Sequence, residues 1–286
     1  MIFSTQDVTV TDRVEIKPFA SGSGWHVVDL TCHSGPNDKP FEEEHNSVAV
    51  AAVLSGTFSY RTTQGRALLA PGSILLGNHG RCFQCEHEHG IGDRCISFHF
   101  TPDYWEEIAS STPGKHRGVF NMASLPPSKA VLPTVSLIEA TLGQQEADME
   151  VVAHDLAAIA LGLAIGSVAV NGNVQKEHER RVSQIIRHIE TTAYDLENNA
   201  TSLAALANQT RLSRYHFLRI FRKLVGIPPH QYTLSLRLKR AAVVTRTTNT
   251  PLSIVALEAG FNDLSTFIRQ FRGIMGVSPR EYRRLF

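Results

Sequence analysis

The strongest constraint on this chain is an internal repeat near its C-terminal end. Two segments, FLRIFRKLVGIPPHQY at 217–232 and FIRQFRGIMGVSPREY at 267–282, align at a constant offset of 50 residues. A short Ala-rich segment, LAALANQ or SIVALEA, and a turn precede each copy. The identical pairs are Phe217/Phe267, Arg219/Arg269, Phe221/Phe271, Arg222/Arg272, Gly226/Gly276, Pro229/Pro279 and Tyr232/Tyr282. A helix, a tight turn and a second helix, present twice, predict two helix-turn-helix units.

Charge is distributed unevenly between the two halves of the chain. Residues 1–177 contain 11 Lys and Arg against 20 Asp and Glu, which gives a net charge of −9. Residues 178–286 contain 17 against 7, which gives +10. The overall charge of +1 conceals this segregation. A basic C-terminal half predicts a polyanion as its partner.

The second helix of each unit has two faces that follow from helical spacing. Apolar positions at i, i+4 and i+7 predict the buried face: Phe217, Phe221 and Leu224, then Phe267, Phe271 and Ile274. The opposite face, with the residues that flank it near the helix starts, carries Arg214, Tyr215, His216, Leu218, Arg219 and Arg222, then Ser265, Thr266, Ile268, Arg269 and Arg272. In a major groove Arg pairs with guanine and apolar groups contact the thymine methyl. These residues are therefore the candidate DNA-binding residues.

A solvated surface is the alternative interpretation of such a face. A single Arg-bearing amphipathic helix is more often solvated than bound to DNA. Two of them at a fixed offset, in a segment of net charge +10, favour nucleic acid. The stretch at about 229–245 predicts a connecting helix of about 26 Å. Such a helix could hold the two reading helices near the roughly 34 Å spacing of successive major grooves.

The C-terminal region closely resembles the DNA-binding domain of the AraC/XylS family of transcriptional regulators. LANQTRLS, FLRIFRKLVG, GFNDLSTFIRQFR and VSPREYRR carry the resemblance. It implies that bases are read through Tyr215, Leu218 and Arg219, and through Ser265, Thr266 and Arg269. Leu218 and Ile268 depart from the polar residues that some members have there. The resemblance also implies promoter DNA and RNA polymerase as partners, with activation commoner than repression.

The N-terminal half reads as short strands between Ile16 and Phe100, which predict a small β-barrel or sandwich, followed by helices at 103–111, 130–146 and 147–170. The family resemblance implies a cupin-like sensor barrel followed by dimerisation helices, and hence a homodimer. The predicted fold is thus α+β and multidomain. Its parts are a cupin-like β-barrel sensor domain at 1–128, a helical dimerisation segment at 129–170, a linker at 171–179 and a DNA-binding domain at 180–286. The helix-turn-helix units are expected at about 202–225 and 252–275.

A cluster of cysteines and histidines in HGRCFQCEHEHGIGDRC is a candidate metal site in the N-terminal half. Its residues are Cys82, Cys85, His87, His89 and Cys95. Thiolate and imidazole are the ligands that Zn²⁺ prefers. If segments 82–89 and 94–100 pair with His87 opposite Cys95, most of these side chains share one face with His99; a one-residue slip separates them. Two alternatives to a metal site remain: a polar strand with small buried thiols, and a reactive thiol that senses an effector.

An enzyme is not expected. PGS at 71–73 resembles the second cupin motif, but His45 stands alone where the first motif has paired histidines, and no nucleophile motif or phosphate loop is present.

The N-terminus lacks an export signal, which predicts a cytoplasmic protein. The apolar stretch 151–170 reads as a packing helix rather than a membrane span.

We expect an effector-responsive regulator, with a small molecule, metal or oxidant as effector. The alternatives are a metal-dependent cupin enzyme with a DNA-binding domain, and a constitutive DNA-binding protein whose barrel only dimerises.

Overall fold

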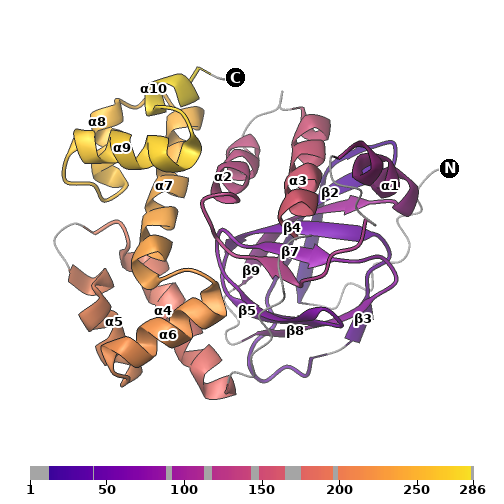
Figure 1. Cartoon of the computed structure of the whole chain (residues 1–286), viewed down its shortest axis with the longest axis horizontal. Helices are drawn as coiled ribbons and strands as arrows, with labels where there is room; N and C mark the ends of the chain where they lie inside the picture. The colour runs from indigo at the N-terminus through magenta and orange to yellow at the C-terminus, as the bar shows by residue number, and fades with distance from the viewer. Residues whose placement is uncertain are drawn as a thin grey trace.

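The computed structural model describes residues 13–40, 42–87, 92–112, 118–142, 148–164, 175–195 and 199–284. A β-rich N-terminal half leads into a series of helices that form the C-terminal half (Figure 1). This arrangement confirms the predicted order of a β-rich region followed by a helical one.

The strands form two antiparallel sheets. The first has the order β1 (Val14–Gly22), β2 (Trp25–Cys32), β9 (Asp93–Phe100), β4 (Val48–Ser55), β7 (Ile74–Gly77) and β10 (Ser124–Leu125). The second has the order β3 (Glu42–Glu44), β8 (Cys82–His87), β5 (Phe58–Thr62) and β6 (Gly65–Leu69). Among the strands that the structure describes, the sheets do not close into a barrel, so the cupin-like barrel is not confirmed.

Strand β4 explains why two layers form on either side of the first sheet. Its sequence VAVAAVLS is buried on both faces except at Ser55. Val48, Val50 and neighbours at the same parity join the core under the helices, whereas Ala51 and Val53 join the core shared with the second sheet. The helical layer consists of α1 (Pro102–Ser111), α2 (Leu132–Thr141) and α3 (Met149–Ala164). The predicted strand and helix segments thus assemble as a sandwich with helices on one face (Figure 1).

The expected pairing of segments 82–89 and 94–100 is wrong. Strand β8 pairs with β3 and β5 in the second sheet. Strand β9 pairs with β2 and β4 in the first. The two segments are close in sequence but belong to different layers, so His87 does not lie opposite Cys95 in a hairpin.

Seven helices and one 3₁₀ turn are described in the C-terminal half. They are α4 (Lys176–Thr192), η1 (Asn199–Thr201), α5 (Leu203–Thr210), α6 (Arg214–Val225), α7 (Pro229–Thr247), α8 (Leu252–Glu258), α9 (Leu264–Met275) and α10 (Pro279–Tyr282). Helix α4 begins within the residues predicted for the linker. No helix in the described ranges has the length and apolar content that a membrane crossing requires.

The cores of the two halves are continuous. Leu68 and Ala70 of the second sheet belong to the core built by α4, α5 and α6. Leu132 of α2 belongs to the core built by α7, α8 and α9. Each helix-turn-helix unit therefore packs against a different part of the N-terminal half.

Candidate nucleic-acid interface

The first unit is formed by α5 and α6, and local signals fix both ends of α6. The Ser213 hydroxyl accepts a hydrogen bond from the backbone N–H of His216 at the start. Gly226 ends the helix with φ 86°, a left-handed conformation that favours glycine. Helix α5 ends at Arg211, which adopts φ 55°. These caps set the tight turn that the sequence predicted between the two helices.

The second unit, α8 and α9, is fixed in the same way with different residues. The Asp263 carboxylate accepts from the backbone N–H of Thr266 at 2.7 Å. This bond keeps the pKa of Asp263 below its ordinary value. Gly276 ends α9 with φ 83°. The turn before α9 contains Gly260 at φ 81°, where an added Cβ would approach the backbone oxygen of Ala193 to 3.1 Å.

The apolar faces of both second helices are buried as the spacing predicted. Phe217, Phe221, Phe267 and Phe271 are each 0% exposed. Within each pair the rings lie edge to face, 5.7 Å apart in α6 and 5.5 Å apart in α9. Leu224 and Ile274 are partly buried at the edge of these cores.

The candidate reading residues lie on the opposite, outward faces. Arg214, Tyr215, Arg219 and Arg222 are exposed in α6, with Tyr215 at 77%, while His216 and Leu218 are half-buried. In α9 the exposed residues are Ser265, Ile268, Arg269 and Arg272, and Thr266 is half-buried. The Arg269 guanidinium lies 3.5 Å from the Thr266 hydroxyl. The structure thus brings each set together on one helix face, in a form that suits a major groove.

Two further residues border these faces and were not identified from the sequence. Lys129 lines an open groove with Ser265, Arg269 and Arg272 of α9. The His178 ring on α4 packs edge-on against His216 at 5.6 Å. Both come from outside the repeat, so the repeat itself gave no signal for them.

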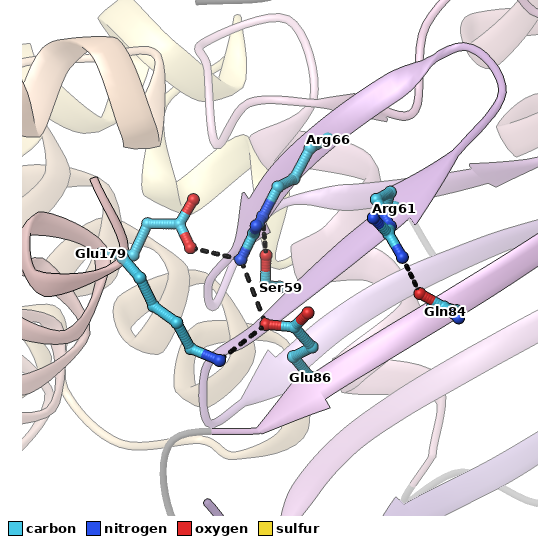
Figure 2. Close-up of polar contacts among 7 residues, drawn as sticks. Ser59, Arg61, Arg66, Gln84, Glu86 and Glu179 are labelled. Atoms are coloured by element: carbon cyan, nitrogen blue, oxygen red, sulfur yellow. Dashed lines mark hydrogen bonds and ion pairs between the residues drawn. The ribbon is translucent and has the colours of Figure 1, made fainter. Parts of the chain in front are cut away.

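Polar contacts join α4 to the second sheet close to the first unit (Figure 2). The Arg66 guanidinium bridges Glu179 of α4 at 2.6 Å and Glu86 of β8 at 3.2 Å, and its Nε donates to the Ser59 hydroxyl at 2.8 Å. Lys176 adds a second contact to Glu86 at 3.3 Å. Helix α4, which shares a core with α5 and α6, is therefore held to the sheet by charges as well as by apolar packing.

A buried lysine makes the corresponding contact on α7. The Lys239 side chain is 7% exposed; its Nζ lies 2.6 Å from a carboxylate oxygen of Glu139 on α2 and donates to the backbone oxygen of Leu54. The lysine end of this ion pair is buried, whereas the Glu139 side chain is 31% exposed. The N-terminal half thus contacts α4, which precedes the first unit, and α7, which connects the two units.

The candidate metal residues are scattered across the two sheets. Cys82 is exposed on β8, Cys85 is half-buried on the same strand, and Cys95 is buried on β9. Nδ1 of His87 donates to the Asp93 carboxylate and Nε2 lies 3.5 Å from Sγ of Cys32, so the ring does not meet the other candidates. His89 lies outside the described residues. Within those residues, no three His, Cys, Asp or Glu side chains are grouped to hold a metal ion, and a Zn²⁺ site that includes His89 stays a prediction.

His99, expected on the same face as these candidates, has a different environment. Its ring stacks on His26 with centroids 4.7 Å apart, and its two nitrogens lie against the hydroxyls of Ser47 and Ser97. Burial lowers the pKa of His99 to about 3, so the ring is neutral. It serves the packing between β2, β4 and β9.

Comparisons with known proteins find similar sequences for the C-terminal region. Residues 206–285 match the family model described as a helix-turn-helix domain. The HTH-type transcriptional activator AarP of Providencia stuartii is 32% identical over 108 residues, which are 38% of this chain and 80% of AarP. The probable transcriptional regulator LumQ of Photobacterium leiognathi is 38% identical over 82 residues, which are 29% of this chain but only 33% of LumQ. A solved transcriptional regulator with an AraC-type DNA-binding domain, from Chromobacterium violaceum, is 24% identical, covers 38% of this chain and 95% of that one, and has a TM-score of 0.34.

The paired units, their outward Arg-bearing faces and the extent of the match to AarP agree on one assignment. The chain belongs to the AraC/XylS family of DNA-binding transcriptional regulators.

Proposed function

We propose that the chain is an effector-responsive transcriptional activator that acts on promoter DNA in the cytoplasm. One observation carries the DNA-reading part of the proposal. Two helices related by the repeat, α6 and α9, bury their Phe-bearing faces and expose Tyr215, Arg219, Ser265 and Arg269 on the opposite faces. A helix that presents Arg and short polar or apolar groups in this way suits base recognition in the major groove.

Activation rests on a relative, and recruitment of RNA polymerase is included because the family resemblance implies it. AarP is named as a transcriptional activator, and we extend this activity to the present chain. Lys129 adds a positive charge to the border of α9, which supports contact with the DNA backbone beside the bases read by that helix.

Control by an effector is supported by the shared cores and polar contacts between the halves. Leu68, Ala70 and Leu132 pack into the two helix-turn-helix cores, and Arg66 is bonded to Glu179. A ligand that alters the β-rich half would change the placement of one or both reading helices, because it would bind the two arrangements with different affinity.

We include a homodimer in the proposal, formed through α3. The buried residues of α3 belong to the core of the N-terminal half, while Val151 on the same helix is 55% exposed. Light scattering of the purified chain measures the mass directly, and a monomeric mass at micromolar concentration would remove this part of the proposal.

The test of DNA binding is to map promoters occupied in the cell and to measure affinity for the mapped fragments in vitro. We expect the full chain to bind these fragments more tightly than unrelated DNA, with affinity that falls steeply as salt rises, because Lys and Arg displace counterions from phosphates. Binding that is insensitive to both sequence and salt would contradict the proposal.

A further inference from the structure

A cysteine, a histidine and a buried carboxylate meet where the two sheets adjoin. Cys32 ends β2 and lies half-buried, with its Sγ 3.5 Å from Nε2 of His87 on β8. Nδ1 of the same ring lies 2.6 Å from Oδ2 of Asp93, whose side chain is 1% exposed. Asp93 begins β9 and is the cross-strand partner of Cys32. The three side chains therefore form a continuous series of thiol, imidazole and carboxylate.

This order of contacts activates a thiol. The carboxylate accepts the Nδ1–H of His87 and fixes the ring, which leaves Nε2 to take the thiol proton. Burial opposes ionisation of Cys32, but hydrogen bonds with His87 and Ser34 outweigh it and lower the pKa of the thiol. Burial likewise opposes the charged form of His87, yet its bonds to Asp93 and Cys32 raise its pKa to about 9. A thiolate beside an imidazolium is the reactive form of cysteine.

The other three cysteines, all of them described by the structure, lack this environment. Cys82 is exposed, and the Glu42 carboxylate raises the pKa of its thiol. Burial raises the pKa of both Cys85 and Cys95, which keeps these thiols protonated. Neither supplies the second thiolate that rapid disulfide formation with Cys32 would need.

We propose that Cys32 is a covalent sensing site for α,β-unsaturated carbonyl compounds. The thiol proton passes to Nε2 of His87, and Sγ attacks the β-carbon. A C–S bond forms as the C=C π bond breaks, its electron pair moves to the carbonyl as an enolate, and the proton on His87 returns to the α-carbon. The addition needs no oxidant and releases no leaving group.

The same residues lead directly to the DNA-binding half. Asp93 packs against Gly56 so closely that a Cβ added there would collide with its carboxylate. The Gly56 N–H donates to Glu190 of α4 at 3.4 Å, and the hydroxyl of the next residue, Thr57, contacts that of Ser183. An adduct on Cys32 displaces His87 from Asp93. Because the Asp93 carboxylate already lies against Gly56, any shift of Asp93 toward Gly56 moves Gly56 and changes its contact with α4. This inference rests on the proposed function, since it names the chemical class of the effector.

The first experiment measures where and how fast the full chain reacts. The protein is treated with limiting 2-butenal at pH 7, and adducts are located by peptide mass mapping. We expect Cys32 to react at least about tenfold faster than Cys82, because its thiolate fraction is larger. Cys82→Ser is the matched control and should leave the rate at Cys32 unchanged. Modification of Cys82 first, or equal rates at both cysteines, would overturn the proposal.

The role of His87 is tested by the pH profile and by one substitution. In the wild type we expect the rate at Cys32 to fall less steeply between pH 8 and 6 than that of an ordinary thiol of pKa near 8.5, which loses about tenfold per pH unit there, because the contact with His87 lowers the pKa of the Cys32 thiol. His87→Gln should restore the ordinary profile. A wild-type profile already like that of a free thiol would refute activation by His87, whether or not the variant folds.

Two other reagents separate this chemistry from its rivals. Hydrogen peroxide that oxidises Cys32 while 2-butenal leaves it intact would overturn the assignment of a carbon electrophile. Equimolar Zn²⁺ that is retained and blocks the reaction would replace the sensing site with a metal site.

The final experiment tests whether modification of Cys32 changes DNA binding. We expect the 2-butenal adduct to change the affinity of the full chain for a mapped promoter at least about fivefold, and Cys32→Ser to abolish this response. Rapid modification without any change in affinity would overturn the coupling to α4 but leave DNA binding intact. Failure of the unmodified chain to bind any promoter would instead count against the proposed function itself.

Discussion

The two helix-turn-helix units begin from the same sequence pattern but differ in what they pack against and what they present. The first unit shares its core with Leu68 and Ala70 of the second sheet and exposes Tyr215. The second shares its core with Leu132 of α2 and exposes Ser265 at the equivalent position. The paired Phe residues are buried equally in both. The two units thus share the same buried face, whereas their docking and reading faces differ.

The largest expected effect tests the claim that the two cores are equivalent. Phe221→Ala and Phe271→Ala each remove a ring that is 0% exposed, and each should lower the free energy of unfolding by about 3 to 5 kcal/mol. Urea unfolding followed by circular dichroism gives both values. Phe19→Ala, at a site 37% exposed on β1, is the control and should change stability little. A large loss in one unit alone would break the equivalence.

The next effect concerns the docking of the first unit. Burial raises the pKa of Glu190 on α4 to about 7, against the opposing influence of the Gly56 N–H and Lys239. The folded state therefore favours the protonated carboxyl. Its contribution to stability is full below the ordinary pKa near 4.5 and is lost as the pH rises through about 7.

Unfolding measured at several pH values tests this difference. Between pH 8 and pH 5 we expect the wild type to gain up to about 3 kcal/mol relative to Glu190→Gln, which does not titrate. Glu258→Gln, on the exposed surface of α8 in the second unit, is the matched control and should keep the wild-type pH dependence. A wild-type profile parallel to that of Glu190→Gln would show that docking of the first unit does not depend on this carboxyl.

The reading faces provide the third test. Arg219→Ala and Arg269→Ala should each weaken binding to a mapped promoter by about 1 to 3 kcal/mol, with relaxed preference at one base position each. Lys17→Ala is the control, because it also removes one positive charge but lies on β1, outside the DNA-binding half. A loss that is equal for all DNA sequences would mean that the arginine contacts phosphate rather than a base.

The smallest effect distinguishes the caps of the two reading helices. The pKa of Asp263 is lowered by the Thr266 N–H, so its capping contribution is present above pH 3.8 and is lost as the pH falls through the lowered pKa. The Ser213 cap has no charge to lose. The difference in thermal midpoint between the wild type and Asp263→Ser should shrink from pH 5 to pH 3, while that for Ser213→Ala stays constant. A constant difference for both would show that the Asp263 charge is irrelevant.

Features that depend on local spacing could be predicted from the sequence. The burial of Phe217 and Phe271 and the exposure of Arg219 follow from 3.6 residues per turn, and the helix ends at Gly226 and Gly276 follow from the left-handed φ of these residues. None of these inferences requires knowledge of a distant partner.

The N-terminal half shows where such inference stops. Strands 82–87 and 93–100 are neighbours along the chain, which favours a hairpin, yet they lie in different sheets, where β8 pairs with β3 and β5 and β9 pairs with β2 and β4. The contact of Cys32 with His87 spans 55 residues, and no local pattern encodes it. Cys32 therefore stood outside the predicted cluster, and Lys129 outside the predicted DNA interface, since both are placed by tertiary packing alone.

The 77% exposure of Tyr215 has a consequence for how such regulators diversify. The side chain at this position hardly affects the folding of α6, because the opposite face of the helix holds the core. Substitutions there can accumulate without passing through poorly folded intermediates. A duplicated gene of this type could thus acquire a new set of target promoters by drift at a few surface codons, while the inherited scaffold continues to fold as before.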